Sequence, residues 1–119
     1  MTCEDGQMLE DIELRDILVN YDKVEDRFDS ARRAEGKLQF SPFTPEARGA
    51  QAGIVAYNVR GLTLRNIALR WPDQTDVEMH FLWASQVEDA FVDCPRAKAS
   101  RPETEIYRIE KSDIVVRDL

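Results

Sequence analysis

The chain has 119 residues, 43% of them hydrophobic, and a formal net charge of −7, which suits one domain with a modest core. No apolar run approaches the roughly 20 residues that cross a bilayer, and the acidic start MTCEDGQMLED does not resemble a signal peptide, so we expect neither a membrane association nor a leader in this sequence. Residues 1–30 hold ten acidic and three basic residues, which argues against nucleic acid as a partner.

The first predicted element is LEDIELRDI at residues 9–17, with apolar residues at its first, fourth, sixth and ninth positions. Its third and eighth residues, Asp11 and Asp16, belong to a type that accepts bends and left-handed backbone. Alternation between these bends directs Ile12 and Leu14 to one face. The segment therefore predicts a short strand bounded by two corners.

Residues 20–52 interrupt this pattern and form a predicted insertion. DKVEDRFDSARRAE, residues 22–35, places Val24, Phe28 and Ala31 on one helical face, and Asp22 with Glu25 has the spacing of a capping box. GKLQFSPFTPEARGAQAG follows with little periodicity and is predicted as a loop. Such an insertion either carries function or covers the core.

The pattern of residues 9–17 returns three times, as VRGLTLRNI at 59–67, VEDAFVDCP at 87–95 and KSDIVVRDL at 111–119, which departs only at Lys111. The intervals between the second and third copies and between the third and fourth are similar and have a length typical of solenoid repeats. The interval between the first two copies is longer, which fits a coil that carries the insertion. Further strands are predicted before three of the copies, in GIVAYN at 53–58, VEMHFLWA at 77–84 and ETEIYRIE at 103–110.

These repeats predict an all-β fold, a right-handed parallel β-helix of about four coils, in one domain over residues 1–119 with the insertion at 20–52. The predicted bends are the third residue of each copy (Asp11, Gly61, Asp89, Asp113) and the eighth (Asp16, Asn66, Cys94, Asp118). A small antiparallel sandwich or an α+β domain is the alternative, because short strands separated by Asp or Gly occur in any β domain.

LEDIELRDILVNY together with GIVAYNVRGLTLRNIALRWPDQTDVEMHFLWASQVEDAFVDC resembles the C-terminal coils of glycoside hydrolase family 28, the polygalacturonase-like enzymes, over about residues 8–95. The resemblance implies a right-handed β-helix, inverting hydrolysis of pectin without metal or cofactor, and a periplasmic or secreted location. The family motifs are Asn-x-Asp, Asp-Asp, Gly-His-Gly and Arg-x-Lys. We expect none of them here, with His80 between Met79 and Phe81, and we assign no catalytic residue.

Four residues are candidates for saccharide contact. If Leu82 and Ala84 face inward, Phe81 and Trp83 face outward, as do Val55 and Tyr57. Outward Tyr57 and Trp83 could then stack on sugar faces, and Arg60 or Arg108 could meet a uronate carboxylate. The alternative is that the insertion covers the outward aromatic residues as a second core.

The remaining chemistry-bearing residues predict no metal or cofactor site. Cys3 and Cys94 form no CxxC pair, and the single histidine, His80, lies in a strand pattern. The sequence thus predicts the noncatalytic C-terminal part of a polygalacturonase-like hydrolase. A stand-alone β-helix module for carbohydrate binding or assembly, self-associating through its open edges, is the other hypothesis.

Overall fold

A computed structural model describes residues 1–3, 6–24, 50–73 and 75–117. These residues form one sheet, and the described part of the chain contains no helix. The strands are β1 (Leu9–Asn20), β2 (Ala52–Arg70), β3 (His80–Asp93), β4 (Tyr107–Glu110) and β5 (Ile114–Val116). Strand order is β1-β2-β3-β4, with β5 also paired to β3, and every one of these pairs is parallel.

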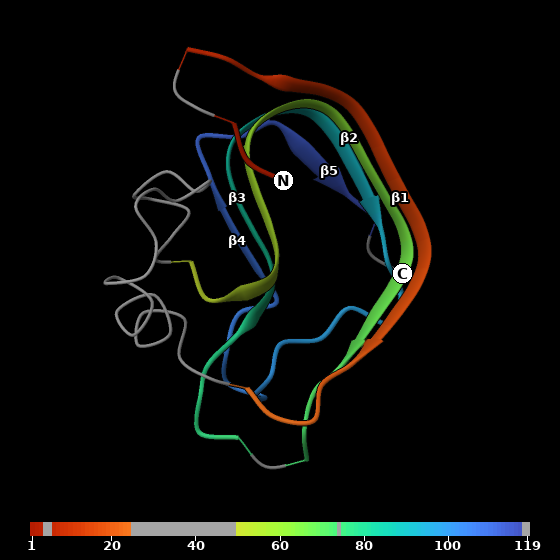
Figure 1. Cartoon of the computed structure of the whole chain (residues 1–119), viewed down its shortest axis with the longest axis vertical. Helices are drawn as coiled ribbons and strands as arrows, with labels where there is room; N and C mark the ends of the chain where they lie inside the picture. The colour runs from red at the N-terminus through yellow and green to blue at the C-terminus, as the bar shows by residue number, and fades with distance from the viewer. Residues whose placement is uncertain (4–5, 25–49, 74, 118–119) are drawn as a thin grey trace, which may run out of the picture.

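β2 and β3 are long strands that bend around the molecule (Figure 1). The segments predicted as separate strands at 53–58 and 59–67 are continuous in β2, and those at 77–84 and 87–95 overlap the single strand β3. After the end of β2 the next strand, β3, starts again beside the start of β2 (Figure 1). The all-β prediction is confirmed, and its sheet is parallel, which rules out an antiparallel sandwich for the described residues.

The strand register matches the predicted alignment of the first three repeats. Leu9 pairs with Val59 and Val59 with Val87, and the fourth and sixth positions of each copy pair in the same way. In the last copy Ile114 pairs with Ala90 and Val116 with Val92, again as aligned. A single register through all four copies keeps their apolar residues on one face.

Three rows of left-handed residues bend the stacked strands. Two were predicted: Asp11, Gly61 and Asp89 have φ of 56°, 75° and 52°, and Asp16 and Asn66 have 56° and 50°. The third row, Asn58, Gln86 and Lys111, has φ of 57°, 54° and 48° and was missed.

The predicted bends at Asp113 and Cys94 are not left-handed. Neither residue is among those with positive φ. Glu110 pairs with Ser85, and Ile114 pairs with Ala90. Three residues lie between Glu110 and Ile114, whereas four lie between Ser85 and Ala90, so the chain between β4 and β5 is one residue shorter at this corner than β3. Lys111 therefore takes the left-handed position, which explains why it departs from the repeat. Asp118, the last predicted corner, lies outside the described residues.

The main core lies on the inward face of the strands and includes Leu62, Leu64, Leu82, Val87 and Val92, all at most 1% exposed. Because the strands stack in register, each of these side chains packs on equivalents one strand away, and their burial supplies the main stabilisation. A second, smaller cluster lies apart from it. Its members are Ala50, Ala52, Val55 and Tyr57, with Trp83 packed against them.

The expectation that Phe81 faces outward with Trp83 is wrong. Phe81 is fully buried and belongs to the main core, as does its neighbour Leu82. The amides of both residues donate to the carbonyl of Ile106, at 2.8 and 3.2 Å. Pairing with β4 begins only at Leu82, so Phe81 lies just before the paired stretch, and strict alternation fails there.

The insertion is only partly described. Asn20 ends β1 and Ala52 begins β2, so the segment between these strands is residues 21–51 rather than 20–52. Most of the helix predicted over residues 22–35 lies outside the described residues. No helix among the residues that the structure describes is long and apolar enough to cross a membrane.

Candidate functional site

Three of the four saccharide candidates lie on one side of the molecule, in β2, β3 and β4. Tyr57 and Trp83 stack with ring centroids 6.4 Å apart and an interplanar angle of 21°. Trp83 pairs in register with Arg108 of β4. Trp83 is half-buried and Arg108 is exposed, but Tyr57 is only 1% exposed. Trp83 and Arg108 therefore remain accessible to a ligand, and Tyr57 supports Trp83 from beneath.

Arg108 already has two acidic neighbours. Its guanidinium lies 3.2 Å from the carboxylate of Glu110 and 3.7 Å from that of Glu105. All three side chains are about half exposed, so these ion pairs are weak and exchangeable. A ligand carboxylate could join Arg108 only in competition with them.

Arg60 does not belong to that surface. It lies beyond the bend at Asn58 and pairs in register with Glu10 of β1 and Glu88 of β3. Its guanidinium is 3.1 Å from Glu88 and 3.5 Å from Glu10. Glu10, Arg60 and Glu88 thus form a row of alternating charge across three strands. This row accounts for Arg60 as a residue that pairs neighbouring strands rather than one that binds a ligand.

A groove lies between the segment after β2 and the segment joining β3 to β4. We call it the basic groove. It has a volume of about 790 Å³, within the range of small-molecule sites. Four basic side chains line it against one acidic one: Arg70, Arg96, Lys98 and Arg101, with Asp73.

Trp71 fixes one wall of the basic groove. Its ring stacks on Tyr21 at a centroid distance of 4.7 Å and an interplanar angle of 14°. Its indole Nε1–H donates to the carbonyl of Lys98 at 2.7 Å. Burial raises the pKa of the Tyr21 hydroxyl, so this ring stays neutral at physiological pH. The stack and the hydrogen bond tie the end of β1, the end of β2 and the basic segment together.

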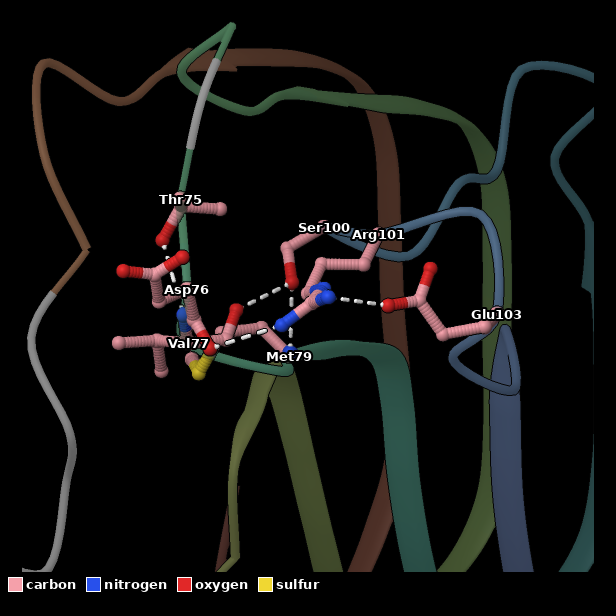
Figure 2. Close-up of polar contacts among 7 residues, drawn as sticks. All are labelled: Thr75, Asp76, Val77, Met79, Ser100, Arg101 and Glu103. Carbon is pink, nitrogen blue, oxygen red and sulfur yellow. Dashed lines mark hydrogen bonds and ion pairs between the residues drawn. The ribbon is translucent and has the colours of Figure 1, made fainter.

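Ser100 and Arg101 also line the groove, and polar contacts fix both of them (Figure 2). The Ser100 hydroxyl accepts from the amide of Met79 at 2.7 Å and donates to the carbonyl of Val77 at 2.7 Å. Arg101 donates to the carbonyl of Asp76 at 3.2 Å and forms an ion pair with Glu103 at 2.5 Å. These contacts hold the segment that contains Ser100 and Arg101 against the residues before β3. The backbone on this side of the groove is therefore fixed in position.

A second depression, of about 550 Å³, surrounds the bend at Gly61. Asp11, Glu13 and Asp89 contribute carboxylates to it, beside the partly exposed ring of Phe91. The depression is acidic, so it would repel an anionic sugar.

Two of the family motifs that we expected to be absent do have a match in the sequence. Asn20-Tyr21-Asp22 has the form Asn-x-Asp, and Arg96-Ala97-Lys98 has the form Arg-x-Lys. Both lie near Trp71, through its stack on Tyr21 and its bond to Lys98. Asp-Asp and Gly-His-Gly have no counterpart. Because inverting hydrolysis needs a paired acid and base across the sugar, these two spacings assign no catalytic residue.

The cysteines and histidine form no reactive cluster in the described residues. Cys94 is 5% exposed, and burial, with a smaller contribution from the charge of Asp93, raises the pKa of its thiol. The Nδ1 of His80 lies 2.6 Å from the carbonyl of Glu105, which gives this ring a structural partner. No group of three His, Cys, Asp or Glu residues in the described ranges could hold a metal ion.

Sequence reasoning missed the basic groove although part of its signal was visible. Arg96, Lys98 and Arg101 alternate with small residues in PRAKASRP, which we interpreted only as a loop between coils. Nothing in the sequence shows that Arg70 and Trp71, which precede the whole of β3, face the same space. Only the register of β2 and β3 brings them together.

Comparison of the chain with protein-family models, with curated proteins and with solved structures finds no match.

Proposed function

We propose that the chain is a segment of a right-handed parallel β-helix and serves as a noncatalytic scaffold of a polygalacturonase-like protein. Four observations support the β-helix: parallel pairing of successive strands, one register through the repeats, rows of left-handed bends, and the return of the chain to the start of each new strand. Crossover connections between parallel strands of one sheet are right-handed in about 98% of cases, which supports the proposed hand.

We further propose that this segment contacts a uronate-containing polysaccharide. One observation carries this proposal: Trp83 and Arg108 are register partners on neighbouring strands, and both are accessible. An indole face can stack on a sugar ring while the guanidinium meets its carboxylate. The stack on Tyr57 orients the indole before any ligand arrives, which lowers the ordering cost of binding.

The test uses the fact that the chain has two tryptophans. In a Trp71→Phe variant, Trp83 is the only indole, and its emission reports binding of oligogalacturonides directly. We expect a saturable change that Arg108→Gln weakens about tenfold, as for loss of a charge-assisted contact. Arg65→Gln, an exposed arginine elsewhere on β2, is the matched control. An unchanged Trp83 spectrum at millimolar ligand would refute the contact.

The noncatalytic part of the proposal has its own assay. The pure chain should release no reducing sugar from polygalacturonate, because the Asp-Asp pair is missing. Release of reducing sugar that persists after further purification of the chain would contradict the noncatalytic proposal. Binding without release is the expected combination.

Assembly is a second candidate function, favoured by the outer edge of the sheet. Ile17 and Leu18 of β1 are 36% and 49% exposed, and Val115 of β5 is 60% exposed. Exposed edges with apolar side chains favour pairing with another chain. Sedimentation velocity over a range of concentrations decides the matter: larger species that Leu18→Lys abolishes support assembly, and a concentration-independent monomer contradicts it.

A further inference from the structure

We propose that the basic groove is a binding site for an oxyanion-bearing ligand, one that presents carboxylate or phosphate groups. The inference concerns a surface separate from Trp83 and Arg108 and does not depend on the sugar proposal. Charge is distributed unevenly over the chain. The whole chain carries −7, whereas the residues lining this groove include four cations and one carboxylate, that of Asp73.

Three of the four cations have no structural ion pair. Arg101 is held by Glu103 and by the carbonyl of Asp76. Arg70, Arg96 and Lys98 are exposed and form no ion pair with any residue that the structure describes. Elsewhere on the surface arginines commonly face acidic register neighbours, as Arg60 does. Cations gathered around one groove without carboxylate partners attract anions by their combined field.

Thr104 provides a second, independent observation. This residue lines the same groove, and its Oγ1 is buried and has no hydrogen-bond partner among the described residues. A buried hydroxyl without a partner is destabilising, because it has given up its hydrogen bonds with water. This oxygen exposes almost no surface, so an oxyanion reaches it only after a small shift of the segment around Thr104, and could then accept the hydrogen bond that the hydroxyl donates.

The walls of the groove are already in place for such a ligand. Trp71 is fixed by Tyr21 and by the carbonyl of Lys98, and Ser100 is fixed by Met79 and Val77. The Lys98 backbone is therefore positioned while its ammonium group remains exposed. Carboxylates and phosphates suit Arg and Lys donors in this setting, because charge-assisted hydrogen bonds are about twice as strong as neutral ones.

The experiment uses a Trp83→Phe chain, in which Trp71 is the only indole and reports on the groove wall. The two probes are inorganic phosphate and trigalacturonate, titrated at constant ionic strength, with calorimetry as the second readout. We expect saturable binding of at least one probe with a change in Trp71 emission. The tighter probe identifies the source of the oxyanion, phosphate or carboxylate.

Two variants test the residues. Arg96→Gln with Lys98→Gln should weaken binding by about tenfold or more, and Thr104→Val, close to isosteric, should weaken it less while leaving the salt dependence unchanged. The matched control is Arg15→Gln with Arg65→Gln, which removes the same charge from register neighbours on β1 and β2. Circular dichroism confirms that each variant is folded.

Three results would overturn the proposal. The first is that neither probe binds up to about 10 mM. The second is that the control pair weakens binding as much as the groove pair, which would mean that only the net charge of the chain matters. The third is that Trp71 emission and affinity are unchanged in both groove variants. Loss of the Trp83 response in the sugar experiment leaves this site unaffected, so the two proposals fail separately.

Discussion

Asn66 donates a hydrogen bond from its Nδ2 to the Oδ1 of Asp16, at 2.9 Å, between residues far apart in the sequence. Both residues are left-handed, with φ of 50° and 56°, and they occupy equivalent corners of β2 and β1 because Ile17 pairs with Ile67. The side chains thus continue the backbone ladder around a bend where the main chain changes direction. Two local preferences for left-handed backbone and one long-range hydrogen bond stabilise the same corner.

Substitution of Asn66 by Ala is expected to lower the free energy of unfolding by about 1–2 kcal/mol, from the lost hydrogen bond and the left-handed strain. Asn66→Gly removes the hydrogen bond but keeps the backbone freedom, so it should cost less. Urea unfolding followed by circular dichroism measures both variants. Equal stability of Asn66→Ala and the wild type would show that this corner contributes nothing.

Gly61→Ala should destabilise the chain by more than about 1 kcal/mol. Gly61 has a φ of 75°, and an added Cβ would lie 2.7 Å from the Oδ1 of Asp11. Gly6 is the matched control, because its φ is 83° but a Cβ there meets no atom within 4 Å. Thermal unfolding of Gly61→Ala, Gly6→Ala and Gly61→Ala combined with Asp11→Gly separates steric contact from strain, because glycine tolerates the φ of 56° at position 11. If the two glycine variants are equally stable, contact with Asp11 has no effect.

Ser100→Ala should cost about 1–2 kcal/mol, because its hydroxyl both accepts from Met79 and donates to Val77. Ser100→Thr retains the hydroxyl and should recover most of this loss. The expected change is also local: amide hydrogen exchange at Met79 should accelerate in the alanine variant. Unaltered exchange there would mean that solvent replaces the hydroxyl without cost.

The Cys94 thiol should make stability depend on alkaline pH. Burial raises its pKa in the folded chain, so the unfolded chain loses the proton first. The contribution of Cys94 is complete below its unfolded pKa, about 8.5, and is lost as the pH rises through the raised folded pKa. Urea midpoints at pH 7.5 and 9.5 under reducing conditions should fall further for the wild type than for Cys94→Ala. Parallel decreases in both chains would contradict this assignment.

The sequence was sufficient for much of the fold because the same feature repeats. Leu9, Val59 and Val87 begin equivalent segments, and their alignment agrees with the strand register. Asp11, Gly61 and Asp89 revealed a row of bends, since these residue types tolerate left-handed backbone better than most. Gln86 and Lys111 have no such preference, and they adopt it because the neighbouring strands impose the corner.

The candidate sites were less predictable, since they depend on where side chains meet. Tyr57 and Trp83 were correctly placed on one face, but no local pattern shows that Tyr57 is almost completely buried. Phe81 and Leu82 are both buried in the main core, so alternation failed at Phe81. The basic groove combines loops that follow two different strands, so its cations are adjacent only after the strands have paired.

The offsets between paired strands have a kinetic consequence. Leu9 of β1 pairs with Val59 of β2 across a longer stretch of chain than separates Val59 from its other partner, Val87 of β3. Closing the longer loop costs only about 0.5 kcal/mol more, so the excursion between β1 and β2 is thermodynamically inexpensive. Pairing across a longer separation folds more slowly, so we expect β2 and β3 to pair before β1 docks on them. Changes of length between β1 and β2 should therefore alter both the docking rate of β1 and the stability of the finished ladder only slightly.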